Sequence, residues 1–156
     1  MKRVPIFPCI AGLHAALAAA ALLWALQARF GDPLTAVLSP AGDSPWEQGK
    51  AAFFPLLAAG PVIWYLAGGG SRSGLCAMAM AGGGAATVLA LAGAAPAIAA
   101  GGAIAAAVAL YGGVLRRLKE HGGWFIAAIL LTAGYILLTI IRPGGALFEA
   151  AMGIPF

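Results

Sequence analysis

The charged residues of this chain are few, and almost all of them lie in short gaps between long apolar segments. Lys, Arg, Asp and Glu make up 9% of the 156 residues, whereas a typical soluble domain has ~25%. The hydrophobic fraction is 62%. A soluble fold with so little charge would associate through its apolar surface. The placement of the charges therefore predicts a chain whose outer surface is covered by lipid.

Five apolar segments have the length of membrane spans, because ~20 apolar residues cross the hydrocarbon core once. We expect spans at approximately 6–30, 51–67, 75–92, 97–115 and 124–141. Gly93-Ala94-Ala95-Pro96 separates the third and fourth segments, which are rich in Gly and Ala, and predicts a tight helical hairpin. The predicted fold class is all-α: a polytopic transmembrane helical bundle, with residues 1–156 as one integral membrane domain and this hairpin at its centre.

The second segment has a clear start and two internal prolines. Ser44-Pro45-Trp46-Glu47 is typical of a helix start, with a serine cap, a proline in the first turn and a capping-box glutamate. Pro55 and Pro61 each remove an internal hydrogen bond. A re-entrant second segment, which gives a four-span protein, therefore stays open as an alternative. We expect the tail 146–156, too short to span, to lie on the membrane surface.

A basic start followed by an apolar run is also the pattern of a cleavable signal peptide. The run of the first segment is long, however, and Leu26-Gln27-Ala28 is a poor cleavage site for an enzyme that needs small residues. We therefore expect the first segment to remain as a span.

The distribution of Lys and Arg predicts the orientation, because cytoplasmic loops carry an excess of them. Five spans with a cytoplasmic N-terminus place six basic residues inside and three outside. The inner residues are Lys2, Arg3, Arg72, Arg116, Arg117 and Lys119, and the outer ones are Arg29, Lys50 and Arg142. We expect a bacterial-type inner membrane, with these charges at the rims and no Asp, Glu, Lys or Arg near the midplane. That lack disfavours proton pumping and ion-coupled transport.

Small residues recur every three or four positions along the third and fourth segments, so they share a helix face. Such faces let two helices approach closely within lipid. Two uses of this face stay open: packing inside the hairpin and docking against a partner. The predicted packing interface consists of Ala79, Gly83, Ala86, Gly101, Ala105, Ala109 and Gly112.

Two weaker candidate sites involve polar side chains. The predicted cytoplasmic side carries four residues of types that bind metals: Cys9, His14, Cys76 and His121. Of these, His14 and His121 could ligate a haem or metal, although no close ligand spacing supports this. A polar site on the outer side would use Arg29, Asp32, Glu47 and Arg142. Thr132, Tyr135 and Thr139 share one face of the fifth segment, where we expect ordinary helix-to-helix hydrogen bonds.

No catalytic motif is present: there is no GxSxG, no HExxH and no acidic pair within a span. We therefore favour a non-catalytic subunit or scaffold of a membrane complex, which docks through its Gly and Ala face onto other membrane subunits or a second copy. A small-solute transporter or channel component is the first alternative, and a haem- or metal-binding redox subunit is the second. We expect no cofactor in the favoured case, contact with membrane lipid, and no nucleic-acid partner, because no basic cluster is interleaved with aromatic residues.

Overall fold

The computed structural model describes residues 6–31, 33–40, 42–141, 145, 147 and 148. The regular elements in these ranges are all helical: α1 (Ile6–Phe30), α2 (Pro33–Leu38), α3 (Pro45–Leu66), α4 (Arg72–Leu91), α5 (Pro96–Gly113), the short 3-10 helix η1 (Leu115–Arg117) and α6 (Gly122–Ile141). Five of them, α1, α3, α4, α5 and α6, are long and apolar enough to cross a membrane. The predicted fold class, a polytopic helical bundle, is confirmed.

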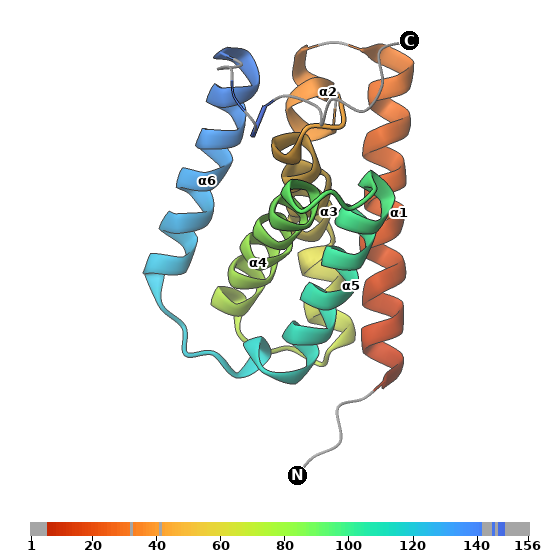
Figure 1. Ribbon diagram of the computed structural model, residues 1–156. Coiled ribbons are helices and arrows are strands. Elements are labelled where there is room, and N and C mark those ends of the chain that lie inside the picture. The colour runs from red at the N-terminus through yellow and green to blue at the C-terminus, as the bar shows by residue number, and fades with distance from the viewer. Residues whose placement is uncertain (1–5, 32, 41, 142–144, 146, 149–156) are drawn as a thin grey trace.

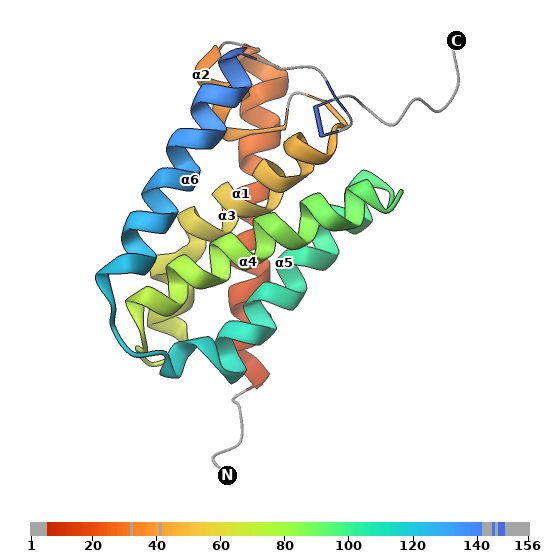
Figure 2. The same cartoon turned by 60° about the vertical axis from the view of Figure 1, so that its left-hand side comes forward.

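The bundle is built around α3 and α4, which pack against each other in its middle (Figure 1). Helix α1 packs on α3 and α5 on one side, and α6 packs on α4 on the other. Helices α4 and α5 run side by side in opposite directions (Figure 2). Their connection passes through Gly93, whose φ of +84° is a conformation that favours glycine. The predicted Gly- and Ala-rich hairpin is therefore present.

Helix α3 begins at the predicted position and is continuous through both of its prolines. The Ser44 hydroxyl accepts a hydrogen bond from the Glu47 backbone N–H at 3.3 Å, and Pro45 occupies the first turn. The 22 residues of α3 extend over ~33 Å at 1.5 Å per residue, about the thickness of the hydrocarbon core. This length fits a full span rather than a re-entrant segment. Helix α2, in the polar gap before α3, was not predicted from the sequence.

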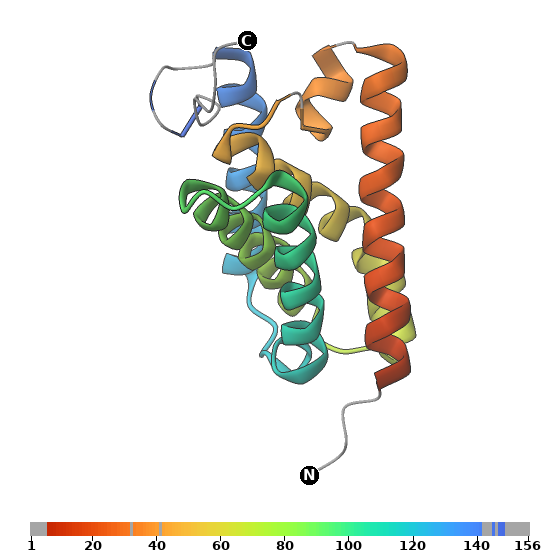
Figure 3. The ribbon, with the colours of Figure 1, turned by 45° about the vertical axis from the view of Figure 1, so that its right-hand side comes forward.

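We name the two ends of the bundle by what lies there. The basic end contains the start of α1, the α3–α4 connection and the segment between α5 and α6, with Arg72, Arg116, Arg117 and Lys119. The α2 end contains the end of α1, α2, the start of α3, the α4–α5 turn and the end of α6 (Figures 1 and 3).

The centre of the bundle is packed through small residues on facing helices. A Cβ atom placed on Gly83 of α4 would lie 3.0 Å from the Phe53 Cβ of α3 and 3.1 Å from the Tyr135 hydroxyl of α6. On Gly12 of α1, it would lie 3.3 Å from Ile63 of α3. These contacts show that glycines permit the close approach of α3 to its neighbours, as expected for helices that associate in lipid.

Candidate functional site

A cavity of about 700 Å³ lies between α1, α3, the α2–α3 connection and the first half of α5, toward the α2 end. Its walls are mainly apolar, and they include Leu17, Trp24, Leu38, Pro55, Ala100 and Ile104. A volume of this size is in the range of pockets that hold small organic molecules in proteins. The cavity is therefore large enough for a ligand and not only for single water molecules.

Three polar side chains lie on the wall of the cavity. Gln27 comes from α1, Gln48 from the first turns of α3, and Asp43 from the α2–α3 connection. Gln48 is 4% exposed, whereas Asp43 is exposed at the α2 end. The Gln27 side-chain oxygen is buried and has no hydrogen-bond partner among the described residues. The cavity thus combines apolar walls with two neutral amides and a carboxylate.

The cavity is closed on the side that faces the basic end, because α1, α3 and α5 come together there. Gly12 of α1 lies against Ile63 of α3 and Val108 of α5, and a Cβ on it would be 3.3 and 3.6 Å from these side chains. Ala16, one turn further along α1, is fully buried. Among the described residues, the lining of this cavity reaches no further toward the basic end than Leu17 on α1 and Ile104 on α5.

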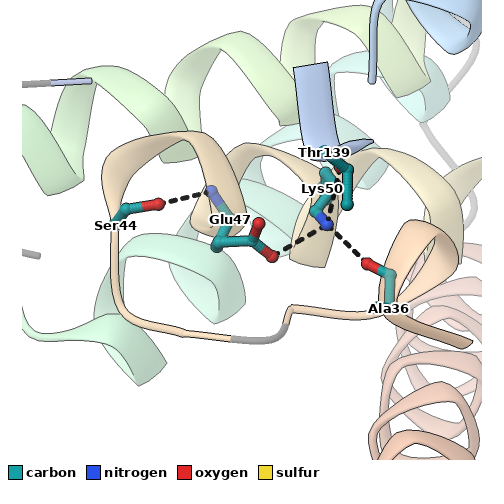
Figure 4. Close-up of polar contacts among 5 residues, drawn as sticks. All are labelled: Ala36, Ser44, Glu47, Lys50 and Thr139. Carbon is teal, nitrogen blue, oxygen red and sulfur yellow. Dashed lines mark hydrogen bonds and ion pairs between the residues drawn. The ribbon is translucent and has the colours of Figure 1, made fainter. Parts of the chain in front are cut away.

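A lysine is completely buried beside this cavity (Figure 4). Lys50 Nζ lies 2.8 Å from Oε2 of Glu47 on its own helix, and it donates to the Ala36 carbonyl of α2 at 2.6 Å and to Thr139 Oγ1 of α6 at 3.1 Å. An ammonium group has three N–H donors, and Glu47, Ala36 and Thr139 are three of the acceptors around it. We call Lys50, Glu47, Ala36 and Thr139 the Lys50 cluster.

Two charged residues of the Lys50 cluster are more buried than the sequence indicated. Lys50 and Glu47 were placed with the outer rim charges, and Glu47 was assigned to an outer polar site. Both lie at the expected end, but inside the protein, with exposed fractions of 0% and 8%. The physical reason is that α2 and α6 cover the first turns of α3, a contact that the order of segments along the chain does not specify. Arg29 of the same predicted site is exposed, and its other members, Asp32 and Arg142, lie outside the described residues.

The Lys50 cluster also positions the rim of the cavity. The ammonium group holds the Ala36 carbonyl of α2. The end of α2 supplies Leu38 to the cavity wall, and the connection after it supplies Pro40, Gly42 and Asp43. Gln48 lies two residues before Lys50 on α3. The cluster is therefore the structural link between α6, on one side of the bundle, and the cavity on the other.

The predicted small-residue interface is divided between two environments. Its α4 members, Ala79, Gly83 and Ala86, are buried inside the bundle. On α5, Gly101 and Ala105 are half-buried, Ala109 is exposed and Gly112 is buried. The buried face of α5 consists instead of Ala99, Ala103, Ile104, Ala107, Val108, Tyr111 and Gly112. Use of the exposed members by a partner stays a prediction.

The candidate metal or haem residues are not brought together. His14 is exposed on α1, where its Nδ1 bonds the Ile10 carbonyl at 2.8 Å, and His121 is exposed just before α6. These two helices lie on opposite sides of the bundle (Figure 1). Cys9 is half-buried on α1, and Cys76 is buried in α4. No group of three His, Cys, Asp or Glu side chains that could hold a metal occurs within the part of the chain that the structure describes.

A second polar cluster lies at the basic end and is exposed to solvent. The Glu120 carboxylate accepts hydrogen bonds from the backbone N–H groups of Arg72 and Ser73 at 2.6 and 3.1 Å, and from the Ser73 hydroxyl at 2.9 Å. These bonds, led by that from Arg72, hold the pKa of Glu120 below its usual value. The His121 backbone N–H also donates to the Ser73 hydroxyl. We call Arg72, Ser73, Glu120 and His121 the Glu120 cluster.

No known protein family, no characterised protein and no solved structure matches this chain.

Proposed function

We propose that the protein binds a small amphipathic solute in the cavity between α1, α3 and α5, as the binding step of a membrane carrier. The observation that carries this proposal is the cavity itself: about 700 Å³, mainly apolar, with Gln27, Gln48 and Asp43 on its wall and closed toward the basic end. A continuous channel is disfavoured, because α1, α3 and α5 pack together between Ala16 and the basic end. A carrier that alternates between two open states has, in each state, a binding site that is open toward one end of the bundle and closed toward the other.

The polar groups of the wall suit a ligand with a hydrogen-bonding head and an apolar body. Two carboxamides can each donate and accept hydrogen bonds, and buried amides impose selectivity because they lose free energy when left unpaired. No cationic side chain lies on the wall of this cavity among the described residues. An anionic head group is therefore disfavoured. Because Asp43 is exposed at the α2 end, we assign the head group to the two amides, so that the proposed solute is neutral there, for example an amide or an alcohol.

The basic residues support an orientation with the basic end and the N-terminus in the cytoplasm of a bacterial cell, and with the cavity open outward. By their positions in the sequence, six Lys and Arg are assigned to the cytoplasmic side and three to the outer side. Burial of Lys50 strengthens this bias, because its charge is paired with Glu47 inside the protein. Only Arg29 and Arg142 then remain as outer basic residues.

The proposal is tested with a cysteine on the cavity wall. Ala100→Cys in a Cys9→Ala, Cys76→Ala background is reconstituted in phosphatidylcholine nanodiscs and reacted with a water-soluble maleimide. We expect octanamide, as a neutral amphipathic probe, to slow the reaction about tenfold at ten times its dissociation constant, because only the free site reacts. On intact cells, an impermeant maleimide should label Ala100→Cys but not Lys119→Cys.

Two neighbouring glycines supply the matched variants. Gly101 lines the cavity and Gly102 does not, and a Cβ on either residue would meet nothing within 4 Å. Gly101→Leu should therefore fill the cavity and abolish protection by octanamide, while Gly102→Leu should keep it. Equal protection in both variants, or a thiol that does not react at all without octanamide, would contradict the proposal.

A second candidate function is the docking of another copy of the chain, as a subunit of a membrane complex. The observation that favours it is an outward row of small residues on α5, Gly102, Ala106, Ala109 and Gly113, of which the first three are exposed. Nothing in the described structure lies within 4 Å of a Cβ on either glycine. Such rows allow close helix contact in lipid. We expect Gly102→Leu, but not Gly101→Leu, to convert a dimer in mild detergent into a monomer, and a monomeric parent protein would contradict this.

A further inference from the structure

A groove of about 350 Å³ lies at the basic end, on the opposite side of α3 from the solute cavity. The second half of α3 forms one wall with Leu57, Gly60 and Trp64, the start of α4 forms the floor with Leu75 and Cys76, and Phe125 of α6 forms the other wall. Its walls are apolar over almost their whole surface. Helix α6 packs on α4 and meets α3 toward the α2 end, through Tyr135 and Thr139. This side of the second half of α3 is left uncovered, with Leu57 37% exposed.

A single cationic side chain lies at the mouth of this groove. The Arg72 guanidinium lies 5.8 Å from the centre of the Trp64 ring and makes no ion pair with the described residues. The Glu120 carboxylate does bond Arg72, but it accepts from the backbone N–H of Arg72 and from Ser73 and not from the guanidinium. The positive charge of Arg72 therefore remains available to a ligand.

We propose that this groove binds an anionic phospholipid of the surrounding bilayer, with its phosphate at Arg72 and part of one acyl chain between α3 and α6. This site is independent of the proposed solute site and lies toward the other end of the bundle. Arginine binds phosphate with several donors in a planar group. Basic side chains between membrane helices on the cytoplasmic side are suited to anionic head groups.

The depth and surroundings of the groove support a lipid occupant. Trp64 donates its indole N–H to the Gly70 carbonyl at 2.8 Å, at the end of α3, where an indole ring lies at head-group level in a spanning helix. Arg116 and Arg117 follow α5 at the same end and add positive charge near it. An uncharged apolar ligand would supply no anion to the Arg72 guanidinium, whereas a phosphate diester with acyl chains uses both the charge and the apolar walls.

The experiment measures lipid adducts by native mass spectrometry during titration with phosphatidylglycerol or phosphatidylcholine. We expect the parent protein to prefer phosphatidylglycerol about fivefold, the effect of one basic residue near an anionic head group. Arg72→Gln should abolish that preference, and Arg72→Lys should keep part of it. Arg117→Gln, which removes an exposed charge at the same end, is the matched control and should keep the preference.

Filling the groove gives an independent test. Gly60 lies on its wall, and a Cβ there would meet only Leu75 at 3.8 Å. Gly60→Leu should therefore reduce phosphatidylglycerol binding, whereas Gly84→Leu, at an open position of α4, should not. If Gly60→Leu does not fold, Leu57→Trp at the exposed edge of the groove replaces it. Equal binding of both lipids, or an unchanged preference in Arg72→Gln, would overturn the proposal.

Discussion

The Lys50 cluster and the Glu120 cluster use similar chemistry in opposite environments. Each cluster joins one end of α6 to another helix. Lys50 on α3 donates a hydrogen bond to Thr139, near the end of α6. Glu120, just before the start of α6, accepts hydrogen bonds from the start of α4. The Lys50 side chain is fully buried, whereas Glu120 is exposed. A charge without water depends on every one of its partners, while an exposed charge that loses a partner can bond water instead. The two clusters should therefore respond very differently to substitution.

The largest effect is expected from Lys50→Met. It leaves the Glu47 carboxylate buried without its ammonium partner, which should lower the free energy of unfolding by about 3–5 kcal/mol. The measurement is unfolding in mixed micelles of increasing denaturing-detergent fraction. Lys119→Met, an exposed residue at the other end, is the control and should change little. The double variant Glu47→Leu, Lys50→Met should recover much of the loss, and a single variant as stable as the parent would show that Lys50 is not buried in a pair.

An intermediate effect is expected from Thr139→Val, which keeps the shape of the side chain and removes one acceptor of Lys50. The loss of a hydrogen bond from a buried charged donor costs about 1–3 kcal/mol, and the same unfolding assay measures it. Thr132→Val is the matched control on the same helix, because its hydroxyl donates only to the Ala128 carbonyl of its own helix at 2.8 Å. Equal losses in the two variants would mean that the bond from Lys50 to Thr139 does not contribute.

The smallest effect is expected from Glu120→Gln, and it should depend on pH. Hydrogen bonds from the backbone of Arg72 and from Ser73 lower the pKa of Glu120 below 4.5. The ionised carboxylate therefore stabilises the fold above pH 4.5, and this contribution is lost as the pH falls through the lowered pKa. The parent should be more stable than Glu120→Gln at pH 7, and the difference should shrink as the pH falls through the lowered pKa of Glu120. A constant difference over this range would show that the carboxylate charge is not responsible.

The helices could be predicted from the sequence because each depends on local information. Helix α1 has the predicted bounds, 6–30, and Ser44 caps α3 as its motif indicated. The break at Gly93 separates α4 from α5 as expected. Helix α2 was not predicted, because six residues between prolines give too short an apolar pattern to be distinguished from a polar loop.

The candidate site could be predicted only in fragments. Pro55, one of the two prolines that kept a re-entrant second segment open, lies on the cavity wall. Gly83, a member of the predicted packing interface, is buried against Phe53. Gln27 falls within the first predicted span and Gln48 just before the second, and nothing in the chain pattern placed the two near one cavity. Their meeting depends on how far α1 diverges from α3 and α5 beyond Ala16, which is a property of packing.

The sequence by itself determined that this is a bundle of apolar helices, and where nearly every helix begins and ends. Composition and local capping decide these features, because a chain in lipid must satisfy its backbone within each helix. Only the tertiary structure decided which charge lies inside. Lys50 reads as a rim residue until α2 and α6 cover it, because burial depends on contacts between segments up to 89 residues apart. The same contacts set the rim of the cavity on which the proposed function depends.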